Sequence, residues 1–295
     1  MTEMTQVDAG KYTYELKSDF PKLPAGVLLG EVPSVAVDSQ DRLYALQRAN
    51  PPVMVFDRDG TYSHCWGIDA ISDPHGMTIV DDTVYITDRK DSVVVIFTLD
   101  GKPLQVIGKR GVHSDTGCEV AGALVPRAAG PFNYPTEIMP GPSGDLYVSD
   151  GYRNCRVHRF TRDGQLINSW GKPGKTAPGE FHLSHRVLVA SDGRVYVCDR
   201  GNQRVQIFSA EGEFINMWTD MGGPNDIAVD KDGVFYIAET TAGGGPGYVS
   251  VRDRAGNVIA RWQTRQMHGL TVDSHGDLYL GSAQNRCIDK YIRRR

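Results

Sequence analysis

The sequence has 295 residues, with 32 lysines and arginines against 36 aspartates and glutamates, and a formal net charge of -4 at pH 7. A slightly acidic chain lacks the basic surface that attracts nucleic acids and anionic membranes, so neither is expected as a partner. With 40% hydrophobic residues the chain can bury a sizeable core, and its length fits two ordinary domains or one large all-β domain.

The cysteines and the hydropathy pattern indicate in which cellular compartment the protein is expected. The five cysteines are an odd number and are scattered without a CxxC motif, so the sequence predicts neither a disulfide framework nor a cysteine zinc site. The N-terminal segment has no basic stretch followed by an apolar run, and no other segment approaches the roughly 20 apolar residues of a membrane span. We expect a cytoplasmic protein without membrane contact and without an obligate protein partner.

An internal repeat organises the chain. Residues 1–11 are expected to form a flexible N-terminus, and the alternating segment 12–16 a strand. A pattern of about 40 residues then recurs, which is typical of propeller blades. Each copy holds an apolar strand, an Asp/Gly turn, a strand centred on Leu/Val-Tyr, a third strand, another turn and a strand that often ends in Trp-Gly. The predicted blades span approximately residues 32–67, 73–111, 132–174, 181–220, 222–264 and 266–295.

The last repeat is incomplete, and this predicts how the array is closed. It holds only three strands before the chain stops at Arg295, whereas the segment 12–16 precedes the first full blade. We expect this segment to supply the missing outer strand and to protect the sheet edges that an open array would expose. The predicted fold is one all-β domain over residues 12–295, a six-bladed β-propeller whose ring is closed by the N-terminal strand.

Three histidines occupy equivalent positions in alternate blades. When the blades are aligned on their tyrosines, the residue at the start of each innermost strand is in turn Ser34, His75, Thr136, His185, Asn225 and His268. Alternate blades of a six-fold ring lie about 120° apart, so these imidazoles would converge on the axis. Three histidines with an open fourth position are typical of catalytic zinc and also suit other divalent first-row metals. A lone histidine at such a position is more often a packing residue.

A second set of equivalent positions lies at the end of each second strand, on the same face of the blades. It includes Arg48, Arg89 and Arg200, and in the third blade Gly151 followed by Tyr152. Guanidinium groups beside a bound cation suit a small-molecule substrate that carries a carboxylate. A tyrosine among these charges could act as a base. The alternative is that the arginines pair with neighbouring carboxylates, such as Asp88 and Asp199.

Two long links lie on this face of the predicted propeller. Residues 108–131 connect an outer strand with the next inner strand, and residues 240–247 form a glycine-rich link. Either could be a lid over the site or a loose surface loop. His113 and Cys118 in the first link are further candidates to reach a metal.

Several segments resemble a known family. The blades resemble NHL repeats, and five segments are similar to the lyase domain of peptidylglycine α-amidating enzymes: DPHGMTI (73–79), residues 147–171, LSHRVLV (183–189), YVCDRGNQRVQIF (196–208) and residues 267–283. That lyase, peptidyl-α-hydroxyglycine α-amidating lyase, cleaves a carbinolamide N–C bond to give an amide and glyoxylate, and uses a zinc held by three histidines. The resemblance implies that His75, His185 and His268 are the ligands, that Tyr152 is the base, and that Arg48 and Arg200 position the substrate.

The chain also departs from that family. Gly269 follows the last of the three histidines where family members have an acidic calcium ligand, which argues against a structural calcium. Arg153 replaces a disulfide cysteine of secreted members. Arg89 is an arginine that the family pattern does not predict, and it could recognise a second carboxylate. We therefore expect a smaller α-hydroxy-amide or another hydroxy acid as the substrate.

The sequence thus predicts a metal-dependent carbon–nitrogen lyase, and two alternatives remain. One is a lactonase-like hydrolase on the same site, for which Glu137, Asn225 and Asp226 supply part of the usual calcium-binding set. The other is a non-catalytic NHL interaction scaffold, although RNA-binding surfaces of that kind are basic.

Overall fold

The computed structural model describes residues 6–7, 12–17 and 19–294, and nearly all regular structure in them is β-strand. The sheets repeat one antiparallel four-stranded pattern, and the fold is a six-bladed β-propeller, as predicted. The chain forms two compact units, residues 1–68 with 226–295, and residues 69–225. The assignment to a single domain stays a prediction. Of the described helices, none is long and apolar enough to cross a membrane.

The unit formed by residues 69–225 holds the second, third and fourth blades. Their sheets are β7–β10, β11–β14 and β17–β20, each with its strands in chain order. The bounds are β7 Pro74–Val80, β8 Thr83–Asp88, β9 Val93–Thr98, β10 Pro103–Ile107, β11 Pro135–Pro140, β12 Leu146–Asp150, β13 Arg156–Phe160, β14 Leu166–Trp170, β17 Ser184–Val189, β18 Val195–Asp199, β19 Arg204–Phe208 and β20 Phe214–Trp218. Two short strands, β15 Lys172–Pro173 and β16 Glu180–Phe181, pair in parallel, and a 3₁₀ turn η1 covers Arg200–Asn202.

The other unit holds the first and last blades and most of the fifth. The first blade consists of β3 Ser34–Val37, β4 Leu43–Leu46, β5 Val53–Phe56 and β6 Tyr62–Trp66. The fifth consists of β21 Gly223–Val229, β22 Phe235–Thr240, β23 Gly247–Arg252 and β24 Val258–Thr264, with a 3₁₀ turn η2 at Ala242–Gly244. The last sheet contains β25 Gly269–Val272, β26 Leu278–Ser282, β27 Cys287–Arg294, β2 Thr13–Lys17 and β1 Gln6–Val7.

The repeated tyrosine is a core residue tied to the preceding turn. Tyr44, Tyr236 and Tyr279 are fully buried, and each hydroxyl donates to an aspartate six residues earlier, Asp38, Asp230 or Asp273, over 3.1–3.3 Å. The other carboxylate oxygen of each aspartate accepts two backbone N–H groups of its turn. One aspartate thus accepts hydrogen bonds from both the backbone of the turn and the buried phenol. This explains the Val-Asp-turn-Tyr spacing of these repeats.

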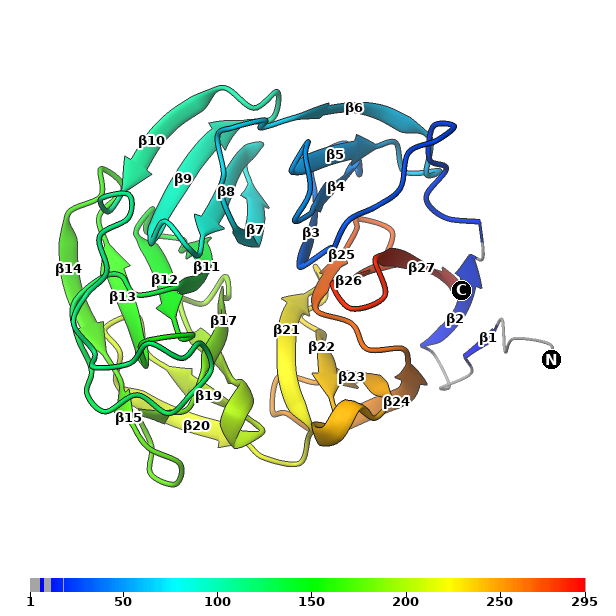
Figure 1. Cartoon of the computed structure of the whole chain (residues 1–295). Helices are drawn as coiled ribbons and strands as arrows, with labels where there is room; N and C mark the ends of the chain where they lie inside the picture. The colour runs from blue at the N-terminus through cyan, green and yellow to red at the C-terminus, as the bar shows by residue number, and fades with distance from the viewer. Residues whose placement is uncertain (1–5, 8–11, 18, 295) are drawn as a thin grey trace. The chain divides into compact units, whose positions relative to one another are not determined.

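The N-terminal strand completes the last blade, as predicted. β2 pairs antiparallel with β27, from Thr13 opposite Arg294 to Lys17 opposite Lys290, and Figure 1 shows this blue strand beside the red C-terminal one. Tyr14 is fully buried, and its hydroxyl donates to Tyr236 Oη over 3.3 Å. Burial raises the pKa of Tyr14 to about 12, so the phenol keeps its proton at neutral pH. In the predicted flexible segment, residues 1–5 and 8–11 lie outside the described residues, and Gln6–Val7 pairs with β2.

Because Tyr14 fastens the N-terminal strand, we expect Tyr14→Ala to lower the free energy of unfolding by about 3–5 kcal/mol, as large-to-small core changes do. Tyr14→Phe removes only the hydroxyl and should cost about 1 kcal/mol. Urea unfolding followed by far-UV circular dichroism measures both. Equal effects of the two variants would mean that the ring of Tyr14 contributes no packing.

Candidate metal centre

Two of the predicted histidines lie side by side at the starts of inner strands. His75 is the second residue of β7 and His185 the second of β17, and both are 2% exposed. Their ring centroids are 4.9 Å apart, with an interplanar angle of 77°. The repeat therefore brings two imidazoles from alternate blades of one unit into contact, as their equivalent positions in the sequence predicted.

Each of the three imidazoles is held by the same hydrogen bond. Nδ1 lies 2.7 Å from a backbone carbonyl oxygen in all three, namely that of Thr136 for His75, of Asn225 for His185 and of Pro33 for His268. A carbonyl oxygen can only accept, so Nδ1 carries a proton, and in a neutral imidazole Nε2 then keeps its lone pair. Metal-ligating histidines are oriented by this kind of bond.

His268 begins the last blade in the other unit. Its backbone N–H donates to Gly281 O over 2.7 Å, which fixes the residue beside the end of β26. His75, His185 and His268 could hold a metal ion, since each offers one ligand atom. Three neutral imidazoles suit zinc and other first-row metals, whereas calcium prefers oxygen ligands.

Tyr152 lies against the two histidines of its own unit. Its hydroxyl is 3.2 Å from Nε2 of His75 and 3.2 Å from Nε2 of His185. The residue before it must be glycine, because a Cβ on Gly151 would lie 2.2 Å from the backbone oxygen of Ser184. This close approach of the end of β12 to β17 positions Tyr152 against the two histidines, and its role as a base stays a prediction.

Arg89 stacks on this tyrosine. Its guanidinium carbon lies 4.9 Å from the centre of the Tyr152 ring, within the range of a cation–π contact. The same guanidinium pairs with Asp73 at 2.8 Å, and not with the adjacent Asp88, which accepts from Ser72 and Arg110. The positive charge of Arg89 is therefore already balanced by a neighbouring carboxylate. Its role in substrate binding stays a prediction.

The other two arginines differ from each other. Arg48 pairs with Glu31 at 2.9 Å, and its side chain is 21% exposed. Arg200 is half-buried in η1, and its guanidinium has no ion pair in the described part of the chain. Asp199 next to it pairs with Arg204 at 2.8 Å, so the alternative of an Arg200–Asp199 pair is wrong. Arg200 is left with an uncommitted positive charge.

The long link 108–131 is bonded to the site tyrosine, but its metal-ligating side chains are engaged elsewhere. Gly122 N donates to Tyr152 O over 2.6 Å. His113 Nδ1 lies 2.8 Å from Ser92 Oγ, and Cys118 Sγ donates to Val120 O over 3.3 Å. Neither residue is in the histidine group found among the described residues. The role of the link as a lid stays a prediction.

The sequence interpretation did not identify the groups that orient the histidines. Thr136 and Asn225 were aligned with the histidines, but they act through backbone carbonyls, whose direction a sequence does not give. Asp73, which pairs with Arg89, stands two residues before His75, where no other blade has an acidic residue. Glu137, proposed for the alternative calcium set, is ion-paired with Arg186.

Comparisons with known proteins agree with the fold and the family. The NHL repeat family matches residues 185–208. The chain is 31% identical to NHL repeat-containing protein 3 of Homo sapiens over 244 residues, which cover 77% of this chain and 67% of that protein. It is 30% identical to peptidyl-alpha-hydroxyglycine alpha-amidating lyase 1 of Drosophila melanogaster over 199 residues, 63% of this chain and 33% of that protein.

A solved structure described as a streptogramin B lyase is similar over 98% of this chain and 100% of its own, with a TM-score of 0.67 and 12% identity, which bears on the fold alone. The chain spans about a third of the Drosophila lyase and two thirds of the human protein. On the identity to the human protein and the match at 185–208, the chain belongs to the NHL repeat family.

Proposed function

We propose that the protein is a metal-dependent lyase that cleaves the C–N bond of an α-hydroxyglycine-type substrate and releases an amide and glyoxylate. The observation that carries the proposal is that three imidazoles share one hydrogen bond, from Nδ1 to a backbone carbonyl oxygen, which makes Nε2 the nitrogen that would bind a metal. The similarity to amidating lyases supports this reaction, although each of those relatives is longer than the chain. A binding scaffold would not need this arrangement.

Different residues of the chain have different roles in the proposed reaction. A divalent first-row ion such as zinc, when bound to the histidines, supplies Lewis acidity toward a substrate oxygen. Tyr152 Oη is proposed to accept the proton of the carbinol hydroxyl as the general base. As the C–O bond becomes a carbonyl, the C–N bond breaks, its electron pair goes to the amide nitrogen, and Tyr152 returns the proton there. Atoms and charges balance, because one amide and one glyoxylate leave for each substrate.

Arg200 is proposed to bind the substrate carboxylate, and Arg48 is proposed as a further substrate-positioning residue. The support is that Arg200 has no ion pair in the described residues, so a carboxylate would not have to displace an internal partner. Arg48 and Arg89 already pair with Glu31 and Asp73 and serve to position groups around the substrate. The substrate class is a small molecule or peptide terminus with a carboxylate. The five free cysteines support a reducing, cytoplasmic setting.

Metal content tests the centre directly. We expect purified protein to carry about one first-row metal ion per chain, and His185→Ala to reduce this to near zero because one of three ligands is lost. Elemental analysis measures it, and circular dichroism verifies the fold. His275→Ala, which changes an exposed histidine of the last blade, is the control and should keep the metal. If His185→Ala retained the metal, the three histidines would not be the metal centre.

Tyr152→Phe should lower kcat for glyoxylate release about 100-fold or more, because it removes the proton acceptor and leaves the ring in place. Metal content should not change. Tyr248→Phe alters another tyrosine that lies beneath an arginine, Arg261 at 4.3 Å, and is the matched control. If both variants release glyoxylate at the wild-type rate, Tyr152 is not the base.

Arg200→Ala should raise KM about 10- to 100-fold, since one hydrogen-bonded charge pair with the carboxylate contributes about 1.5–3 kcal/mol. The measurement is the initial rate of glyoxylate formation against substrate concentration. Arg194→Ala removes an exposed arginine of the same blade and should leave KM as it is. A normal KM in Arg200→Ala would assign the carboxylate to another cation.

A further inference from the structure

Tyr134 stands in the third blade, immediately before β11. It precedes by two residues the position that holds the histidines in alternate blades, and no other blade has an aromatic residue at the equivalent place. Its side chain is half-buried. The reaction described above assigns no role to this tyrosine, although it belongs to the same unit as Tyr152.

The backbone of Tyr134 is held in an unfavourable conformation. Its φ is +63°, in the left-handed region that bulky residues rarely adopt. Its N–H donates to Ser92 Oγ over 3.1 Å, and its carbonyl oxygen accepts from Tyr152 N over 3.4 Å. Strained conformations of this kind persist where the surroundings enforce them, and they gather at functional sites. The backbone of Tyr134 thus links the second blade, which carries Ser92, to the turn that carries Tyr152.

The ring of Tyr134 contacts two guanidinium groups. The guanidinium carbon of Arg153 lies 4.1 Å from the centre of this ring, and that of Arg89 lies 5.9 Å from it. Arg89 is at the same time 4.9 Å from the centre of the Tyr152 ring. A cation is attracted to an aromatic face within about 6 Å of its centre. Tyr134 therefore contacts both the arginine that stacks on Tyr152 and the arginine that follows Tyr152 in the chain.

The contact with Tyr134 restricts where Arg89 can lie. Arg89 pairs with Asp73 at 2.8 Å, but both side chains are partly exposed, and an ion pair of this kind holds a long side chain only weakly. The aromatic face of Tyr134 is a second point of attachment, and it is carried by a backbone that is itself fixed. Two points of attachment keep the guanidinium on the ring of Tyr152.

We propose that Tyr134 is a positioning residue, which keeps Arg89 on the ring of Tyr152 and thereby holds the Tyr152 hydroxyl against His75 and His185. That hydroxyl lies 3.2 Å from Nε2 of each histidine, so a small rotation of the ring would break both contacts. Misplacing a reacting group by about 1 Å can lower a rate about 100-fold. The inference rests on the proposed lyase function, and it deepens that function by naming a residue that sets the geometry of the base.

The first test compares two substitutions of Tyr134. Tyr134→Leu removes the aromatic face, whereas Tyr134→Phe keeps the face and removes only the hydroxyl. We expect Tyr134→Leu to lower kcat for glyoxylate release from N-acetyl-α-hydroxyglycine about tenfold, with KM within about twofold of wild type, and Tyr134→Phe to keep the wild-type kcat. Circular dichroism and elemental analysis verify fold and metal content. Tyr248→Leu removes another ring that contacts an arginine, Arg261 at 4.3 Å, and should leave kcat unchanged.

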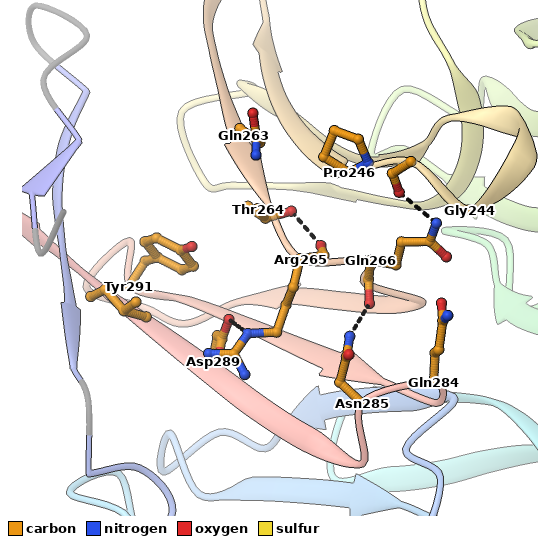
Figure 2. Close-up of a pocket in the computed structure, with 12 residues that line it drawn as sticks. Gly244, Pro246, Gln263, Thr264, Arg265, Gln266, Gln284, Asn285, Asp289 and Tyr291 are labelled. Atoms are coloured by element: carbon orange, nitrogen blue, oxygen red, sulfur yellow. Dashed lines mark hydrogen bonds and ion pairs between the residues drawn. The ribbon is translucent and has the colours of Figure 1, made fainter. Parts of the chain in front are cut away.

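A double-mutant cycle tests whether Tyr134 acts through Arg89. Arg89→Met should lower kcat about as much as Tyr134→Leu does, and the double variant should be no slower than the slower single variant, because both changes break the same contact. The matched control for loss of a paired arginine is Arg265→Met, since Arg265 pairs with Asp289 at 3.2 Å in a pocket of the other unit, shown in Figure 2. If the two effects multiply instead, Tyr134 acts independently of Arg89 and the proposal is wrong.

The outcomes separate the role of Tyr134 from the lyase function. If wild type releases glyoxylate but Tyr134→Leu keeps the wild-type kcat, or Tyr134→Phe loses as much as Tyr134→Leu, the positioning role is overturned and the lyase function stands. If wild type releases no glyoxylate, the lyase function fails, and crystal structures of wild type and Tyr134→Leu decide on Tyr134. Displacement of Tyr152 Oη from the two histidines in Tyr134→Leu supports the role, whereas Oη retained within hydrogen-bond distance of both overturns it.

Discussion

The hydrogen bond from each histidine Nδ1 to the carbonyl of the next blade is the interaction on which the site depends. It fixes the ring plane, selects the tautomer and directs Nε2 away from the blade that supplies the carbonyl. Because the acceptor belongs to the neighbouring blade, the orientation of an imidazole is determined by how closely two blades pack. The chemistry of the site is therefore coupled to the packing of the repeat.

Two glycines make that packing possible. A Cβ on Gly76, directly after His75, would lie 2.3 Å from the same Thr136 carbonyl that orients the histidine. A Cβ on Gly269, directly after His268, would lie 2.7 Å from the Cα of Ser34. No side chain fits at either position without moving backbone. A side chain at position 269 would thus have to displace the backbone of the first blade, and the absence of calcium stays a prediction.

Features that repeat with the blades could be predicted from the sequence. Aligning the blades on their tyrosines predicted the strand register. The register in turn predicted that His75 and His185 occupy equivalent positions and that the N-terminal strand completes the last blade, because each depends on a position within one repeat. The partners of the arginines could not be predicted this way. Asp88, adjacent to Arg89, accepts hydrogen bonds from Ser72 N and Oγ in the preceding turn, and Arg89 instead reaches Asp73.

The ion pairs of the three arginines limit the possible charge of the substrate more than the number of arginines does. Three arginines at equivalent positions suggested room for a second carboxylate at Arg89. Two of them are compensated, Arg48 by Glu31 and Arg89 by Asp73, and the imidazoles orient as neutral groups. Arg200 then contributes the one uncompensated guanidinium among the predicted arginines. A substrate with one carboxylate neutralises it, whereas a second carboxylate would have to displace an existing ion pair and leave its partner unpaired. Among the predicted arginines, the chain therefore offers one unpaired cation to a substrate, and a divalent ion on the neutral imidazoles would add further positive charge.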